Sequence, residues 1–407
     1  MASRSWETGV KHPHSLAFLG FLACLAALPP LSIDMALPAL GQIGCSLHAA
    51  PGLTGLTLSL FMAGFAATPV IYGPLSDRYG RKPVLAVAIT LFTLGSLAAA
   101  MAPSIGLLLT ARCIEGAGAG GGTALAFALT RDCFEGAAGR SKLSQIQMVM
   151  AFAPMIAPTI GATLLVLGWR SIYAALAVGG LALLVLILSA LKETNKMLVR
   201  HKGLFGQVRH GYAALFKHRA ALGYALVYAA SFGVQFSFVA GSPLVFIDSF
   251  GLSARMYGLV FGAASAGIIL GAISNNAFMR MRVSQDKALR LSLGLYIVTG
   301  LAMLGVLQAG MASPGWFIPL LVLSAYGYGI IAPNASHGTM QALPEIAGIA
   351  GAVLTTLQMS TAVLASAVVA AAFAHFAIAA MVVPMVIFGL VTNGLYYFLV
   401  RPAVKHG

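Results

Sequence analysis

Three ionisable side chains stand inside long apolar stretches of this 407-residue sequence. They are Asp34, Arg112 and Glu115. A charge at the centre of a membrane-spanning helix costs about 2.5–3.5 kcal/mol on insertion scales, so each one needs a partner, a wet cavity or a function. A carboxyl group beside a guanidinium changes its affinity for protons when its surroundings change from apolar to wet. These residue types therefore have the chemistry of a proton switch.

Their spacing indicates which of them can meet. With the first span at residues 15–40 and the fourth at 106–130, Asp34 and Arg112 each lie about six residues, or about 9 Å, from the outer end of their helix. We therefore expect that Asp34 and Arg112 can face each other. Glu115 follows Arg112 by one helical turn on the same face. Glu115 is either a second proton carrier or the fixed counter-ion of Arg112. The alternative to a proton switch is that Asp34, Arg112 and Glu115 form a buried salt-bridged trio that only joins the first and fourth helices.

The composition shows which elements must hold these residues. Of the chain, 59% is hydrophobic and only 8% is charged, with a mean hydropathy of +0.91, against roughly 25% charged residues in soluble domains. All but three of the 24 Lys and Arg fall in short loops or tails on one predicted side. This positive-inside pattern accounts for the net charge of +14 and makes a nucleic-acid partner improbable. The chain is predicted to be an integral, multi-pass membrane protein in a lipid bilayer.

We predict an all-α protein of twelve membrane-spanning helices in two six-helix bundles. Breaks at Gly, Pro and charge clusters place the spans at residues 15–40, 53–75, 83–102, 106–130, 143–167, 171–191, 221–246, 255–279, 290–309, 315–341, 348–373 and 379–400. The even count puts both termini in the cytoplasm. The long basic connection after the sixth span gives an N-terminal bundle at 1–191, a cytoplasmic linker at 192–219 and a C-terminal bundle at 220–407.

A specific motif lies between the second and third spans. Residues 73–82 read GPLSDRYGRK, a tight turn with two glycines and charges of both signs. Residues 112–118 read RCIEGAG, and residues 153–162 of the fifth span read APMIAPTIGA. The first span contains IDMALPAL at residues 33–40, and the second half contains GSPLVFI at 241–247 and YGLVFG at 257–262.

Together these motifs resemble the major facilitator superfamily over nearly the whole chain. The loop is similar to its G-x-L-x-D-R-x-G-R-[KR] signature, the fourth span to R-x-x-[QE]-G, and the fifth span to the G-P-x-x-G-G motif of twelve-span drug:proton antiporters. The remaining segments resemble the bicyclomycin and chloramphenicol resistance (Bcr/CflA) branch. In the fifth span Ala157 and Ala162 stand where that motif has glycine, although small-residue packing at Ala153 and Ala157 is kept.

The resemblance implies roles for the motif residues. We expect the loop to act as a cytoplasmic latch in which Asp77 meets Arg81, Asp132 or the N-terminus of a neighbouring helix, and which breaks as the halves move. The predicted latch residues are Gly73, Asp77, Arg78, Gly80, Arg81, Lys82 and Asp132. The predicted antiporter-motif residues are Ala153, Pro154, Ala157, Pro158 and Gly161.

Polar and aromatic residues within the spans are candidates for a substrate cavity near the midplane between the halves. Besides Asp34, they are Gln147, Met150, Phe232, Gln235, Phe236, Tyr326, Asn334 and Gln358. Helix packing is the alternative role for each. The four cysteines have no paired spacing, so we expect neither a disulfide nor a metal site.

We therefore expect a proton-coupled transporter in the inner membrane of a bacterium, which exports small amphipathic compounds by alternating access. Its partners are the substrate and protons, the proton gradient takes the place of a cofactor, and a monomer suffices. Export of an endogenous metabolite such as an amino acid or a peptide is the alternative. A non-transporting membrane sensor is a weaker one, and an enzyme is not expected because no nucleophile and base pair is visible.

Overall fold

The structure is a computed structural model that describes residues 16–66, 68–134, 136–194, 215–343 and 347–405. Every regular element in these ranges is helical. The first half contains α1 (Leu16–Asp34), η1 (Leu37–Ala39), α2 (Leu40–Ser46), α3 (Pro51–Ala66), α4 (Thr68–Tyr79), α5 (Arg81–Ala100), α6 (Ile105–Cys133), α7 (Gly136–Leu164), η2 (Leu165–Leu167) and α8 (Arg170–Ser189).

The second half begins after the predicted linker, most of which lies outside the described residues. It contains α10 (Arg219–Pro243), the π-helical η3 (Leu244–Ser249), α11 (Ala254–Arg280), α12 (Gln285–Gln308), α13 (Pro314–Ala342), α14 (Ala347–Phe376), α15 (Ala379–Leu395), the π-helical η5 (Tyr396–Val400) and α16 (Arg401–Lys405).

These elements supply ten or eleven of the predicted twelve spans. Ten helices of the described chain are long and apolar enough to cross a membrane. An eleventh candidate span combines residues 52–66 of α3 with residues 71–79 of α4, which are bent by 43° relative to each other. The helix at the predicted fourth span, α6, is 29 residues long but carries Arg112, Glu115, Arg131 and Asp132, and it is not among these apolar helices. The predicted all-helical membrane fold is confirmed.

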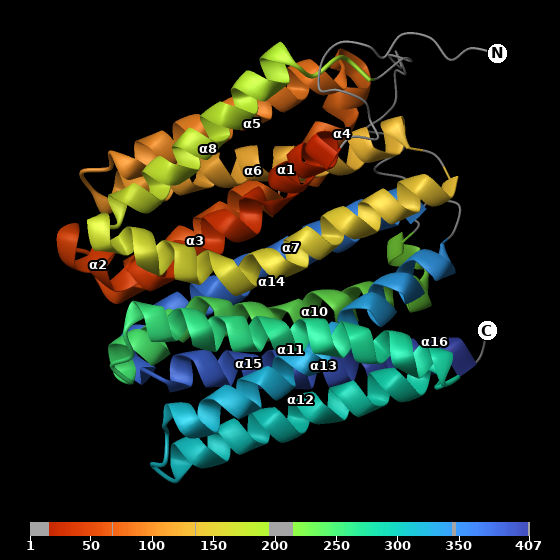
Figure 1. The fold of residues 1–407 in the computed structure, drawn as a ribbon. Coiled ribbons are helices and arrows are strands. Elements are labelled where there is room, and N and C mark those ends of the chain that lie inside the picture. The colour runs from red at the N-terminus through yellow and green to blue at the C-terminus, as the bar shows by residue number, and fades with distance from the viewer. Residues whose placement is uncertain (1–15, 67, 135, 195–214, 344–346, 406–407) are drawn as a thin grey trace.

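The helices form two groups, with α1 to α8 on one side of the molecule and α10 to α16 on the other (Figure 1). Both ends of the described chain lie at the same end of the bundle, here named the terminal end; the other is the opposite end. The groups meet where α3 packs on α14 and α7 packs on α11, and η1 and α2 add contacts to η3, α10 and α11. Because α2, η3 and the start of α3 lie at the opposite end, these contacts join the groups there.

The first span is longer and less regular than its sequence indicates. It continues through a break at residues 35–36 to Ser46, whereas we predicted an end at residue 40. Pro29 and Pro30 lie inside α1, and Pro38 lies in η1, where each lacks a backbone donor. Asp34 is therefore about 18 Å from the end of its span at 1.5 Å per residue, about twice the predicted depth.

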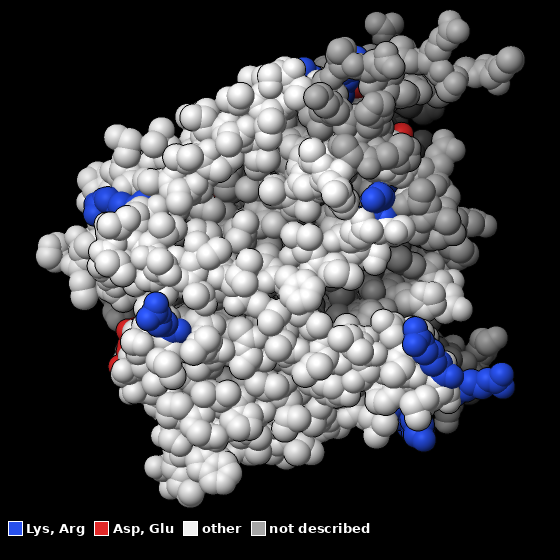
Figure 2. All heavy atoms as spheres, viewed as in Figure 1, with Lys and Arg blue, Asp and Glu red and all other residues white. Residues whose placement is uncertain are grey.

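The lateral surface is apolar, as expected for a surface in contact with lipid. In Figure 2 the visible Lys and Arg gather at the two ends of the molecule, and the broad band between them is uncharged. The large apolar side chains that are exposed on the molecule include Leu94, Val178, Leu270, Val298 and Leu390. A multi-pass membrane location follows from this band and from the span lengths.

Candidate functional site

Arg112 and Glu115 form an ion pair inside the first group of helices. The Arg112 Nη1 atom lies 2.8 Å from the Glu115 Oε2 atom, and both side chains are fully buried. The guanidinium also lies over the rings of Phe61 and Tyr173, at 4.4 and 5.5 Å from their centres. A buried ion pair of this kind needs its remaining hydrogen-bonding groups to be satisfied as well.

Asp34 does not join this pair, contrary to the expectation that Asp34 and Arg112 meet. The ion pairs among the described residues do not include Asp34, whose side chain is only 5% exposed. The physical reason is the geometry of α1. Ser32 interacts electrostatically with Glu115, and residues two apart in a helix point about 200° from each other. Asp34 therefore faces away from Arg112.

On that other face, Asp34 lies near a tyrosine of the second group of helices. The Asp34 carboxyl group is close enough to Tyr257 of α11 to interact with it electrostatically. The Tyr257 hydroxyl is fully buried and lies 2.9 Å from the Ser242 Oγ atom of α10, which is also buried. A carboxyl group from one half thus lies within electrostatic range of a pair of hydroxyls from the other.

The fifth-span motif explains how these two halves come together. A Cβ atom on Gly161 would lie 2.1 Å from the backbone oxygen of Met35, so only glycine permits this contact between α7 and the break after Asp34. Two residues earlier, Thr159 packs on Gly258, the neighbour of Tyr257. Ala153, Ala157 and Pro158 are buried and Pro154 is half-buried in the same helix. The motif is therefore a packing surface that holds α1 and α11 on one stretch of α7.

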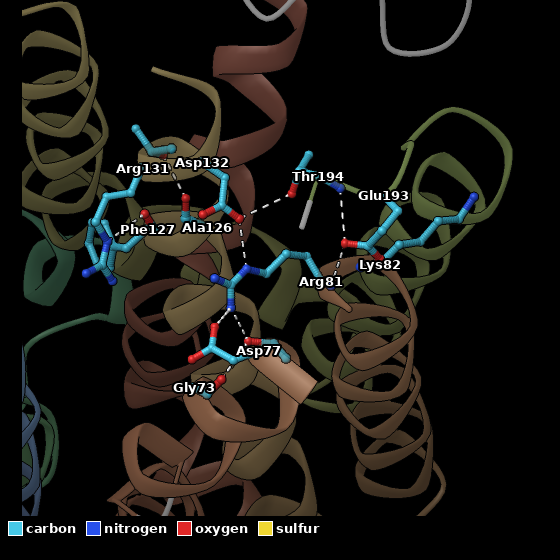
Figure 3. Close-up of polar contacts among 12 residues, drawn as sticks. Gly73, Asp77, Arg81, Lys82, Ala126, Phe127, Arg131, Asp132, Glu193 and Thr194 are labelled. Atoms are coloured by element: carbon cyan, nitrogen blue, oxygen red, sulfur yellow. Dashed lines mark hydrogen bonds and ion pairs between the residues drawn. The ribbon is translucent and has the colours of Figure 1, made fainter. Parts of the chain in front are cut away.

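The loop motif forms a polar network at the terminal end (Figure 3). Arg81 lies between two carboxylates, with its Nη1 atom 2.5 Å from Asp77 and its Nε atom 2.8 Å from Asp132. Arg81 also donates a 2.6 Å hydrogen bond to the Ser76 hydroxyl, which in turn bonds to the Gly73 carbonyl. Arg81 thus ties the ends of α4 and α6 to the start of α5.

The other loop residues have smaller roles in this network. The Lys82 ammonium group donates to the Leu188 carbonyl at 3.0 Å. Arg78 lies over the ring of Tyr79, 5.1 Å from its centre. Gly80 has a φ of +100° and would place a Cβ atom 2.5 Å from the carboxylate of Glu193. Glycine is therefore required at this turn for both backbone conformation and space.

Glu193 is a member of this network that the sequence did not reveal. Its carboxylate accepts the backbone N–H groups of Arg81 and Lys82 at 2.8 and 3.0 Å. A carboxylate is favourable at a helix N-terminus, where free N–H groups and the helix dipole meet it. The contact spans 112 positions of sequence, and we found no local pattern that marks it. Glu193, rather than Asp77, binds the N-terminus of α5.

The structure shows that the predicted cavity residues differ in burial and in the contacts that they make. Gln147 is exposed on α7, and Met150 is half-buried against the main core. Asn334 donates to Asn275 at 2.6 Å and accepts from Gln285 through its backbone, so it joins helices of the second group. Tyr326 is half-buried on α13 and Gln235 is buried on α10.

Three of the predicted residues do lie in one side-chain cluster, which we name the aromatic face. Phe232 packs on Phe236, with ring centres 5.5 Å apart, and Gln358 accepts a 3.1 Å hydrogen bond from Tyr228. Phe232 also lies 6.0 Å from Tyr328, which interacts with Gln358. Tyr228 and Tyr328 were not predicted, although Tyr228 stands one helical turn before Phe232 and that spacing could have indicated it.

Two groups of helices, joined at one end and carrying a buried carboxyl group near the contact between them, are the arrangement of a membrane transporter. The comparisons with known proteins give the family. Residues 22–366 match the family model described as the Major Facilitator Superfamily. The chain belongs to this superfamily, which confirms the expected family. It is therefore a secondary transporter rather than an enzyme, of a family that uses ion gradients and no cofactor.

Individual relatives agree with this assignment. The chain is 33% identical to the uncharacterized MFS-type transporter YdgK of Bacillus subtilis, over 85% of this chain and 86% of that protein. It is 26% identical to the bicyclomycin resistance protein homolog of Haemophilus influenzae, over 85% and 87%. Among solved structures, a D-xylose-proton symporter is similar with a TM-score of 0.72 and 15% identity, over 95% of this chain and 98% of that one. This last likeness concerns the fold alone.

Proposed function

We propose that this chain is a proton-coupled exporter of small amphipathic compounds, with Asp34 as the coupling acid. The observation that carries this proposal is the position of Asp34. It is a buried carboxyl group on a membrane-spanning helix, near the contact between the two halves, and it makes no ion pair with the described residues. Ionisable residues inside a membrane are expensive and mark proton or substrate pathways.

The surroundings of Asp34 support a link between its protonation and the arrangement of the halves. An ionised carboxylate without a cationic partner is strongly disfavoured in a dry interior, whereas a protonated one is tolerated. The arrangement in the structure, with the halves joined beside Asp34, therefore favours the neutral acid. When the halves part there, water reaches Asp34 and the proton can exchange. If substrate and proton exclude each other, the inward flow of protons drives substrate outward.

The orientation of the chain is part of the proposal. We place the protein in the inner membrane of a bacterium with the terminal end in the cytoplasm, since that end carries Arg78, Arg81, Lys82, Arg131 and Arg280. The halves at 1–191 and 220–407 then meet on the periplasmic side and the substrate site opens inward. In this scheme the Arg81 network keeps the cytoplasmic end of the first half rigid while the halves move.

The substrate class is proposed from the aromatic face and from the names of the relatives. Phe232, Phe236, Tyr228, Tyr328 and Gln358 offer rings and a few hydrogen bonds but no charge, which suits neutral or weakly polar aromatic compounds. One relative is named a bicyclomycin resistance protein homolog, and others are named multidrug resistance protein MdtL. A dedicated exporter of an endogenous metabolite is the alternative that the experiment must separate.

The test is a drug-susceptibility panel in an efflux-deficient bacterial host. The host expresses the wild-type chain, Asp34→Asn or Asp248→Asn, at equal membrane levels. Asp248 is the control because it is an exposed acid of the second half that lies beside Gly41 at the opposite end, so it shares the acid chemistry of Asp34 but not its burial. We expect resistance with the wild type and with Asp248→Asn, and none with Asp34→Asn.

Each other result has a definite meaning. Resistance that survives in Asp34→Asn would keep export but remove Asp34 from coupling. No resistance to any compound would contradict the drug exporter and favour the dedicated metabolite exporter. Substrate can also be added to proteoliposomes that contain the wild-type protein. If this addition releases no protons, proton coupling itself is contradicted.

A further inference from the structure

The Arg112 and Glu115 pair lies within a cluster of polar atoms that lack hydrogen-bond partners. The atoms concerned are Nε and Nη2 of Arg112, Oε1 of Glu115, and the hydroxyl oxygens of Ser32, Ser96 and Tyr173. Each is buried and makes no hydrogen bond with the described residues. We name these five residues the inner polar cluster. It draws on α1, α5, α6 and α8, and it lies wholly in the first half.

The atoms of this cluster lie close together. Arg112 pairs with Glu115 at 2.8 Å and its guanidinium lies 5.5 Å from the centre of the Tyr173 ring. The hydroxyls of Ser32 and Ser96 interact electrostatically with the Glu115 carboxyl group, although neither makes a hydrogen bond of ordinary geometry with it. Tyr173 likewise lies in the field of both charged groups. The five side chains therefore converge on one small region.

Close helix packing seals this region from bulk water. A Cβ atom on Gly95 would lie 2.6 Å from the backbone nitrogen of Glu115, and one on Gly116 would lie 2.0 Å from the backbone oxygen of Phe61. These contacts bring α5 and α3 against α6 on both sides of the ion pair. A ligand of the cluster must therefore be small, and it must remain in place for longer than surface water does.

We propose that the inner polar cluster is a binding site for internal water. Buried polar groups in proteins are paired as a rule, either with protein atoms or with ordered water. A buried water makes about three hydrogen bonds and requires two to four polar partners. The cluster supplies three N–H donors on two nitrogens of Arg112, one carboxylate acceptor and three hydroxyls that can act as either. An anion would be repelled by Glu115 and a cation by Arg112, so a neutral, two-way hydrogen-bonding molecule fits best.

This site is separate from the proposed coupling acid, because Asp34 faces the other side of α1. The bound water completes the hydrogen bonds of the ion pair and allows two charges to remain inside the first half. The inference does not depend on which substrate the protein carries or on whether transport is coupled to protons.

The test uses X-ray radiolysis of the full-length purified protein in detergent, followed by mass spectrometry. Radiolysis generates hydroxyl radicals from water, including bound water, and these oxidise the nearest side chains. Tyr173 is the reporter. Tyr296 is the matched control, since it is also buried within one half but donates to the Ser231 carbonyl at 3.5 Å. Tyr79, which is 58% exposed, reports on bulk water.

We expect Tyr173 to be oxidised about tenfold faster than Tyr296, because only Tyr173 has water as a neighbour. After rapid mixing with H2 18O, Tyr79 should acquire the heavy isotope at once and Tyr173 only after a delay. A combined Ser32→Ala and Ser96→Ala variant, which removes two of the ligands, should lower the oxidation of Tyr173 and leave Tyr79 unchanged.

Two results would overturn the inference. Equal oxidation of Tyr173 and Tyr296, at any level, would mean that the cluster is dry. Isotope uptake at Tyr173 as fast as at Tyr79 would mean an open path to solvent rather than a bound molecule. Both readouts come from the wild-type chain, so they hold even if the serine variant does not fold.

Discussion

Ser32 and Asp34 lie two residues apart on α1 and serve opposite sides of that helix. Ser32 interacts with Glu115 inside the first half, whereas Asp34 lies within electrostatic range of Tyr257 of the second half. About half a turn of helix thus separates an enclosed ion pair from a carboxyl group at the contact between the halves. This division assigns the two groups different roles, and each role can be tested by substitution.

Tyr257 is the first such test, since it is the residue of the second half that lies near Asp34. We expect Tyr257→Phe to slow substrate-driven proton release about fivefold, because this variant removes the buried hydrogen bond between Tyr257 and Ser242 near Asp34, and such a bond contributes about 1 kcal/mol. The dissociation constant of the substrate should change by less than about twofold. Proton release and substrate binding are measured separately in proteoliposomes and in detergent.

Tyr328→Phe is the matched control for that measurement. Tyr328 belongs to the aromatic face and interacts with Gln358, so its substitution should weaken substrate binding more than proton release. Equal effects of the two substitutions on both readouts would contradict a specific role of Tyr257 beside Asp34.

The ion pair of Arg112 and Glu115 allows a second prediction. Glu115→Gln leaves the buried guanidinium without its counter-ion and should destabilise the protein by about 3–5 kcal/mol. A double variant, Arg112→Met with Glu115→Leu, removes both charges and should recover most of that loss. Unfolding in denaturant, followed in detergent, gives the comparison.

The same double variant settles the role that the sequence left open for Glu115. If it still exchanges substrate for protons at the wild-type ratio, Glu115 is the fixed counter-ion of Arg112. A changed ratio with intact folding would make Glu115 a second proton carrier.

Some of these relationships could be predicted from the sequence and others could not. The pairing of Arg81 with Asp77 follows from residues one helical turn apart, and its pairing with Asp132 from a charge at the end of a neighbouring span. The orientation of Asp34 depends on where its span ends and on the break after residue 34, which hydropathy does not locate. Glu193 is joined to α5 only by the tertiary fold, so no sequence pattern indicates it.

Gly161 provides a third prediction, on the packing of the fifth-span motif. Gly161→Ala would place a Cβ atom 2.1 Å from the Met35 backbone oxygen. Backbone cannot yield as a flexible side chain does, so we expect a loss of about 2 kcal/mol or more of stability. The matched control is Gly179→Ala, at an exposed position of α8 with nothing within 4 Å of the added atom. Thermal unfolding should separate the two variants, and equal melting temperatures would contradict the contact.

The contact between α3 and α14 provides the last prediction, on the movement of the halves. The Ser59 and Ser366 hydroxyls lie 2.8 Å apart across the two halves, and Ala370 packs on Gly52 and Gly55 beside them. Oxidation of a Ser59→Cys and Ser366→Cys variant should therefore form a disulfide. Because alternating access requires this contact to open, the cross-linked protein should lose transport and regain it on reduction. Each single cysteine variant, oxidised in the same way, controls for the four native cysteines. Full transport by protein shown to be cross-linked would mean that the halves move without separating at this contact.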